Sequence, residues 1–148
     1  MALEDKELLL KDLYARLPYG FTVRRYSDNR DITFGKNELD EFSHFLEYSE
    51  GKEFKPYLRQ MSSMTEEEVD ELIAILNKQC TGRVISKDNF ELTSFGTLWF
   101  TNMKEYECVS VQLMAVVIDY CNANHFDYRG LIPMGLALEA PEGMYEKF

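Results

Sequence analysis

The amino-acid sequence predicts an α+β fold in which a small antiparallel sheet is packed by about three helices. Segments with apolar residues at helical spacing flank shorter segments in which apolar and polar residues alternate, and turn-forming residues separate them. The chain has 148 residues, of which 45% are hydrophobic, so it can bury a substantial core within one domain. We therefore expect residues 1–148 to form a single domain.

The first helix is predicted over residues 3–17. Its apolar residues recur at helical spacing and predict one buried stripe, made of Leu9, Leu10, Leu13, Tyr14 and Leu17. The charged residues of this segment, Asp12 and Arg16 among them, are expected on the remaining faces. Pro18 ends the helix, because the residue before a proline is pushed out of the helical region. Gly20 is expected to adopt a positive φ in the turn that follows.

A β-hairpin is predicted next, with strands over residues 21–26 and 31–34 and a turn over residues 27–30. Apolar and polar residues alternate in the first of these strands, as is typical of a half-buried strand. Residues 38–48 fit a helix as well as a strand of a small sheet, and the pattern leaves both interpretations open. Residues 54–58 are expected to be extended around a proline.

The sharpest local signal is the start of the second helix. Thr65 and Glu68 predict a capping box, in which each side chain binds a backbone N–H group that the first helical turn leaves unpaired. Three consecutive glutamates in that turn complement the positive end of the helix dipole. The apolar stripe that follows consists of Val69, Leu72, Ile73 and Leu76. This helix is predicted to continue to about Gln79 and to end by Gly82.

The remaining part of the predicted fold combines strands and a third helix. Residues 84–101 are expected to be rich in strand, with a hairpin across residues 94–96. Residues 108–124 are the most apolar stretch, and its length favours a helix over a pair of strands. Because polar residues leave only a narrow stripe on this helix, we expect it to be largely buried.

Charge and composition exclude several classes of function. Sixteen Lys and Arg against 26 Asp and Glu give a formal net charge of −10. Such a surface repels phosphates at long range, so we expect no nucleic-acid partner. No apolar run approaches the ~18 residues that cross a bilayer, so no membrane association is expected. Acidic residues near the amino end and only three cysteines indicate a protein of the reducing cytoplasm.

Metal and cofactor sites are not indicated by the sequence. Cys121 and His125 are four residues apart and would share a helix face if the helix extended that far. Zinc requires three or four ligands, however, and neither Cys80 nor Cys108 has the spacing of a paired ligand. The chain also lacks the glycine-rich motifs that bind nucleotide phosphates. We therefore expect neither a metal ion nor a cofactor.

Four residues near the carboxyl end form the one compact group of mixed chemistry: His125, Asp127, Tyr128 and Arg129. We call them the C-terminal cluster. In one interpretation Arg129 binds a carboxylate or phosphate and Asp127 orients His125, as a small hydrolase would require. In the other, the aspartate and the arginine pair to hold an irregular chain end against the core, helped by the aromatic ring. We favour the second interpretation and predict no catalytic residue.

A second candidate site is acidic. Residues 38–71 contain eleven Asp or Glu residues against two lysines and one arginine. Glu66, Glu67 and Asp70 are the candidate contacts with a basic protein partner, or with an enzyme of nucleic acids whose substrate they would mimic. The alternative is an ordinary solvated face.

Four segments resemble a family of small uncharacterised proteins of gut anaerobic bacteria, often found in prophages or other mobile elements. The segments are residues 10–20, 55–68, 125–132 and 135–145. The family has no established activity, cofactor or catalytic residue, so the resemblance implies no functional site. It implies a cytoplasmic bacterial protein with a phage-related role.

Together these observations favour a non-enzymatic protein-binding or regulatory factor. One alternative is a small hydrolase that uses His125 and Asp127, and another is a structural subunit of an assembly. The partner and the oligomeric state are left open by the sequence.

Overall fold

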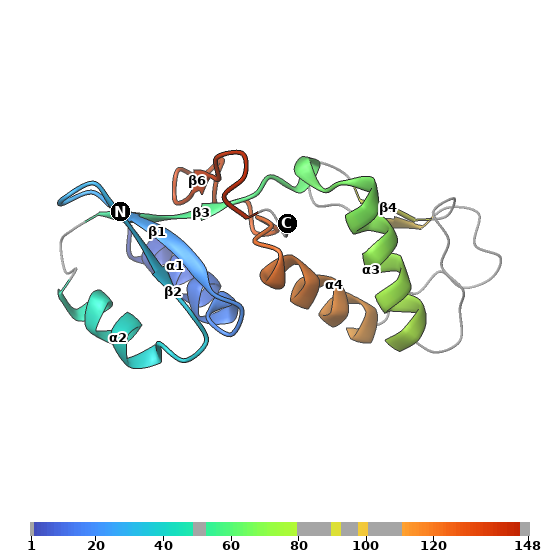
Figure 1. Ribbon diagram of the computed structural model, residues 1–148, viewed down its shortest axis with the longest axis horizontal. Helices are drawn as coiled ribbons and strands as arrows, with labels where there is room; N and C mark the ends of the chain where they lie inside the picture. Colours follow the sequence, from blue (N-terminus) through green and yellow to red (C-terminus); the bar gives the residue numbers. More distant parts are fainter. Residues whose placement is uncertain (1, 49–52, 80–89, 93–97, 101–110, 146–148) are drawn as a thin grey trace. The chain divides into compact units, whose positions relative to one another are not determined.

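The structure is a computed structural model that describes residues 2–48, 53–79, 90–92, 98–100 and 111–145. Within these residues it has four α-helices, a four-stranded sheet and a two-stranded sheet, which confirms the α+β class. The chain forms two compact units, which are Met1–Arg59 with Asn122–Phe148, and Gln60–Cys121. Figure 1 labels their α-helices and most of their strands. The single domain expected from the sequence stays a prediction.

The first unit is built around the four-stranded sheet (Figure 1). Its elements are α1 (Leu3–Arg16), β1 (Phe21–Arg25), β2 (Arg30–Phe34), α2 (Leu39–Tyr48), β3 (Phe54–Leu58) and β6 (Leu138–Glu139). The strand order is β2–β1–β3–β6. Strand β1 is antiparallel to β2 and β3, as expected, whereas β6 is parallel to β3 and makes the sheet mixed. A strand of two residues has no alternation from which it could be predicted.

The predicted hairpin and the turn before it are confirmed. Strands β1 and β2 pair from Phe21 with Phe34 to Arg25 with Arg30. Gly20 has a φ of 87°, and a Cβ atom added there would lie 3.2 Å from the carbonyl oxygen of Phe34. Glycine is therefore required at this position both by the backbone conformation and by the close approach of β2.

Residues 38–48, which the sequence left open between helix and strand, contain the helix α2. Phe42 and Phe45 are three residues apart, so both lie on the buried face of the helix. Their rings pack against the ring of Phe34, with centroids 5.3 and 5.2 Å apart, respectively. This helix adds a fourth to the three that the sequence predicts.

The helix α1 begins at Leu3, as expected, and ends at Arg16. The prediction that Pro18 pushes Leu17 out of the helical region is wrong, because Leu17 has helical backbone angles, with φ −53° and ψ −39°.

The buried face of helix α1 also differs from the expected one. Leu9, Leu13 and Leu17 are buried, as predicted, whereas Tyr14 is 45% exposed. The prediction that Asp12 and Arg16 lie on the remaining, solvated faces is wrong, because both side chains are 0% exposed. At 100° per residue these two positions lie directly beside the leucine stripe, and the opposite charges of the buried pair compensate each other.

The second unit contains η1 (Met61–Ser63), α3 (Glu66–Gln79), β4 (Phe90–Leu92), β5 (Leu98–Phe100) and most of α4 (Val111–Ala123). The capping box is confirmed: the N–H of Glu68 donates to the Thr65 hydroxyl, and the N–H of Thr65 donates to the Glu68 carboxylate, both at 3.2 Å. Helix α3 ends at Gln79, as predicted. Strands β4 and β5 are antiparallel, whereas Gly82 and the expected turn at residues 94–96 lie outside the described residues.

The third predicted helix is confirmed as α4, which pairs with α3 in the antiparallel direction. The Tyr120 hydroxyl lies 3.1 Å from the carbonyl oxygen of Glu68, and the Gln112 side-chain amide donates to the carbonyl of Gln79. The prediction that this helix is largely buried is wrong, since one side of it is exposed, Val111 by 87%. Across the described part of the chain, no helix is both long and apolar enough to span a membrane.

Candidate functional site

The backbone of the C-terminal cluster is attached to the end of strand β3. Helix α4 ends at Ala123, and the chain then runs beside Arg59, forming a parallel bridge at Phe126. The N–H of Arg59 donates to the carbonyl of His125 at 2.7 Å, and the N–H of Asp127 donates to the carbonyl of Arg59 at 2.8 Å. The cluster therefore extends the hydrogen bonding of the sheet rather than lying on a free loop.

Asp127 organises the loop that follows it. Its side chain is buried, and its two carboxylate oxygens accept the backbone N–H groups of Leu131 and Ile132, at 2.8 and 2.9 Å. Both oxygens are thus used to satisfy main-chain donors that would otherwise be buried without a partner. Gly130, inside this loop, has a φ of 76°, which allows the chain to turn back.

Arg129 pairs with Asp12 of helix α1, whereas the sequence interpretation pairs it with an aspartate of its own segment. The Nε of Arg129 donates to Asp12 at 3.1 Å. Arg16 donates from Nε to the other oxygen of the same carboxylate at 2.7 Å and from Nη2 to the carbonyl of Phe126 at 2.8 Å. Charge-assisted hydrogen bonds of this kind are among the stronger ones in proteins. They connect the C-terminal cluster to the first helix.

Asp12 and Arg16 are the residues of this site that sequence reasoning missed. A signal for them exists, because Asp12 follows Leu9 by three residues and Arg16 follows Leu13 by three. These spacings place both charged residues on the leucine face. An aspartate and an arginine four residues apart on an apolar face indicate a buried ion pair, whereas the same pair on a polar face would be solvated.

Tyr128 covers the ion pair. Its ring centroid lies 5.2 Å from the guanidinium carbon of Arg16 and 5.0 Å from that of Arg129. Both distances are within the range of cation–π attraction. Within the described residues the buried Tyr128 hydroxyl has no hydrogen-bond partner, and neither has Nη1 of Arg16.

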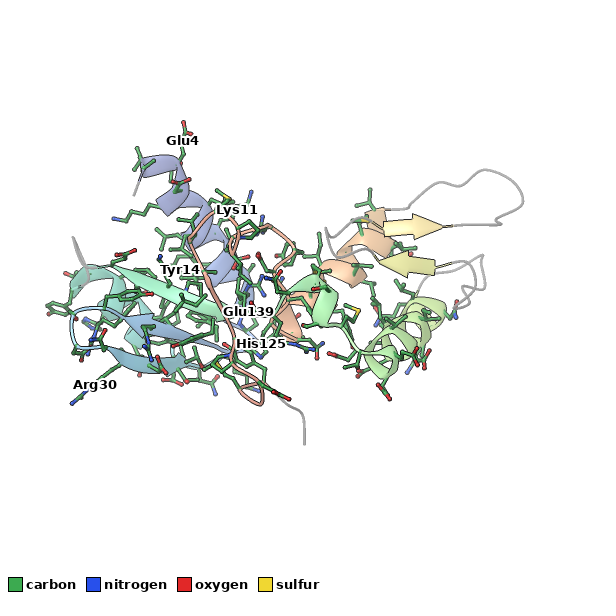
Figure 2. The ribbon with its side chains drawn as sticks, turned by 90° about the horizontal axis from the view of Figure 1, so that it is seen from above. Glu4, Lys11, Tyr14, Arg30, His125 and Glu139 are labelled. Atoms are coloured by element: carbon green, nitrogen blue, oxygen red, sulfur yellow. The ribbon has the colours of Figure 1, made fainter. Side chains whose placement is uncertain are left out.

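His125 is packed against an aromatic ring rather than against Asp127. Its imidazole stacks on Tyr145, with centroids 3.7 Å apart and the planes 13° from parallel. Figure 2 labels His125 among the side chains of this unit. Its buried Nδ1 has no hydrogen-bond partner in the described part of the chain. Tyr145 is itself held in place, because its hydroxyl donates to the carbonyl of Tyr57 at 2.9 Å and accepts the N–H of Thr22.

The electrostatic surroundings keep this imidazole neutral. Burial is the main cause that lowers the pKa of His125 to about 4, and the positive charges of Arg16 and Arg59 add to it. The backbone of His125 has a φ of 66°, in the left-handed region, where asparagine is better tolerated than most residues.

Stability is expected to depend on the titration of His125. Because its pKa is about 4 when folded and 6.5 ordinarily, the unfolded chain binds more protons between these values. The free energy of unfolding should therefore fall as the pH is lowered from about 6.5 to about 4. Denaturant unfolding across this range should show a shallower dependence of the free energy of unfolding on pH for His125→Asn than for the wild type. If the free energy of unfolding depended on pH in the same way for the wild type and for His125→Asn, His125 would not be the group responsible for this dependence.

The acidic candidates lie together on the second unit. Glu66, Glu67 and Asp70 are all exposed and belong to the first turns of α3. The neighbouring Glu68 is buried and is used in the capping box, so it does not belong to this surface.

The geometry required for a metal ligand pair is not formed by Cys121 and His125. Helix α4 ends at Ala123, two residues before His125. The backbone of His125 is in the left-handed region, so the chain no longer follows the helix there. Cys121 and His125 therefore share no helix face. Cys80 and Cys108 lie outside the described residues. Among the residues that are described, no three His, Cys, Asp or Glu side chains are grouped so that they could hold a metal ion.

The fold and the C-terminal cluster define an α+β protein whose carboxyl-terminal segment is held to its first helix and central strand by polar contacts. Comparison of the chain with family models, curated proteins and solved structures found no match. The resemblance to proteins of gut anaerobes therefore stays a prediction.

Proposed function

We propose that this chain is a non-enzymatic factor that binds a basic protein surface in the bacterial cytoplasm. Two features support the proposal. The side chains of Asp127 and Arg129 make contacts that hold the first unit together, and an exposed acidic surface lies on a well-capped helix of the second unit. The phage or mobile-element setting rests on the resemblance of the four sequence segments.

The observation that carries the non-enzymatic part is the use of Asp127. A hydrolase built on this cluster would need the carboxylate to orient the imidazole of His125. Instead, the two carboxylate oxygens of Asp127 accept hydrogen bonds from the N–H groups of Leu131 and Ile132. The imidazole faces Tyr145, and burial disfavours its protonated form. These contacts favour the fastening role over the hydrolase alternative.

The binding part rests on Glu66, Glu67 and Asp70. Their carboxylates project from a helix whose first turn is fixed by the capping box, so a partner would meet them in a preorganised arrangement. The net charge of −10 adds long-range attraction for a basic partner and speeds encounter with it.

The proposal is tested by affinity capture from a lysate of a gut anaerobe. Wild type is compared with the triple reversal Glu66→Lys/Glu67→Lys/Asp70→Lys. The control reverses three exposed glutamates of the first unit, Glu4, Glu7 and Glu41. We expect proteins that wild type and the control retain and the α3 variant loses, with retention weakened by salt.

Three results would count against this function. The first is an identical set of captured proteins for all three chains. The second is hydrolysis of a generic ester or phosphate ester by the wild type that His125→Asn abolishes, which would favour the hydrolase. Self-association of the wild type in sedimentation, without a captured partner, would favour the structural subunit.

A further inference from the structure

The hydroxyl of Tyr145 lies between the ends of strands β1 and β3. The described ladder between these strands ends where Val23 pairs with Pro56, and at the next position Thr22 faces Tyr57. The N–H of Thr22 donates to the Tyr145 hydroxyl at 3.3 Å, and this hydroxyl donates to the carbonyl of Tyr57 at 2.9 Å. The phenol oxygen therefore bridges a donor and an acceptor that belong to neighbouring strands.

The phase of the ladder shows that Thr22 and Tyr57 are suited to bond directly. In an antiparallel pair, residues that exchange hydrogen bonds alternate with residues that do not. The N–H of Tyr26 donates to the carbonyl of Glu53 at 3.1 Å, so Arg24 and Thr22, two and four residues earlier, are also hydrogen-bonding positions. Without the phenol, the N–H of Thr22 would reach the Tyr57 carbonyl at the usual distance of about 2.9 Å. Both arrangements satisfy the same two backbone groups.

The segment that carries the phenol, residues 141–145, has few other attachments. Just before it, the N–H of Ala140 donates to the carbonyl of Leu58 at 2.7 Å. In this described stretch, the one backbone hydrogen bond lies within its own turn, from the N–H of Met144 to the carbonyl of Pro141. The first three residues of the segment are exposed. The side chain of Tyr145 is therefore its main contact with the sheet.

His125 supports the ring of Tyr145. The two rings stack with centroids 3.7 Å apart, and the phenol covers one face of the imidazole. The charged groups that act on this imidazole are Arg16 of α1 and Arg59, which follows β3. Departure of the phenol would leave both arginines in place and would expose the covered face of His125 to water.

We propose that residues 141–145 form a releasable latch that switches the junction of β1 and β3 between two states. In the latched state the phenol of Tyr145 bridges the strands and covers His125. In the released state Thr22 bonds directly to Tyr57, and the imidazole is accessible to solvent. Because no backbone group loses its partner on release, the two states differ mainly in the contacts of one ring, which permits a populated minor state. The latch belongs to the first unit and is independent of the acidic surface of α3.

The test compares two variants of the full chain, Tyr145→Phe and Tyr145→Ala. The first keeps the ring and loses the hydroxyl, whereas the second loses both. The control is Tyr19→Phe, which changes a tyrosine of the same unit that is 46% exposed. Amide hydrogen exchange is measured by NMR at Thr22, with Arg24 inside the ladder as the reference. The titration of His125 is followed in the same samples.

We expect the two variants to have opposite effects on Thr22 and His125. In Tyr145→Phe the ring still separates the strand ends but offers no acceptor, so the Thr22 amide should exchange at least about tenfold faster than in the wild type. In Tyr145→Ala the strands pair directly, so Thr22 should be as protected as Arg24. The pKa of His125 should stay near 4 in Tyr145→Phe. In Tyr145→Ala it should rise towards 6.5 without reaching it, because the positive charges that lower it remain.

Reversibility is tested in the wild type by NMR relaxation dispersion, which detects minor states on the microsecond to millisecond timescale. We expect exchange at the Thr22 and Tyr57 amides, with minor-state chemical shifts equal to those of Tyr145→Ala. The control Tyr19→Phe should match the wild type in every measurement. Flat dispersion profiles at both amides would overturn the inference. So would faster exchange at Thr22 in Tyr145→Ala than in Tyr145→Phe, or loss of protection at Arg24 in Tyr145→Ala, because the phenol would then be a fixed part of the sheet.

Discussion

Replacement of Asp12 by alanine is expected to lower the free energy of unfolding by about 3–5 kcal/mol, the cost typical of breaking a buried ion pair from one side. Asp12 and Arg16 are both 0% exposed, so the variant leaves a buried guanidinium without its counterion. Arg129 loses its partner as well. The change is measured by denaturant unfolding of the full chain.

Two further variants isolate the cause of this loss. Glu7→Ala removes an exposed carboxylate from the same helix and should change stability by no more than about 0.5 kcal/mol. The double variant Asp12→Leu/Arg16→Met removes both charges of the buried pair. It should be less destabilising than Asp12→Ala, because it leaves no buried guanidinium at position 16 without a counterion. A stability for Asp12→Ala within about 1 kcal/mol of the wild type would show that the pair is not buried as described.

The second large effect is expected for Asp127→Ala, at about 2–4 kcal/mol of lost stability. The variant leaves the N–H groups of Leu131 and Ile132 without their acceptors, and each such group typically costs about 1–3 kcal/mol when buried. Asp127→Asn should lose less, because its remaining side-chain oxygen can accept one of the two donors. Thermal and denaturant unfolding of both variants measure this order.

A matched control is available in the same part of the chain. Glu142→Ala removes an exposed carboxylate from the same carboxyl-terminal segment and should leave stability unchanged. If Asp127→Ala proved as stable as Glu142→Ala, the side chain of Asp127 would have no fastening role, and the hydrolase interpretation of the cluster would gain support.

Elements with strong local signals could be predicted from the sequence. Helix α3 is defined by Thr65 and Glu68, which fix its start through contacts within one turn. The first hairpin is defined by its turn and alternation. Residues 38–48 could not be decided, because Phe42 and Phe45 suit a buried helix face while short aromatic runs also suit strands. What decides between them is packing against Phe34, a contact that no local pattern contains.

The sequence pattern locates the C-terminal cluster but does not indicate which residues contact it. The cluster of His125, Asp127, Tyr128 and Arg129 is visible as a run of polar and aromatic residues. Its main partner, Asp12, lies 117 positions away from Arg129. Only the fold brings such residues together. Because Asp12 and Arg16 are charged, the sequence pattern predicts that they face solvent, whereas both are buried. If an aspartate and an arginine at i and i+4 are counted as one neutral pair, the sequence pattern places Asp12 and Arg16 on the buried face of the helix.

The central claim is that the C-terminal cluster fastens its segment to the fold. Native-state hydrogen exchange at the Leu131 and Ile132 amides tests it most directly, because both donate to Asp127. The claim predicts opening free energies for these two amides within about 1–2 kcal/mol of those in strand β1. Exchange of both amides at the rate of an unprotected loop would contradict it.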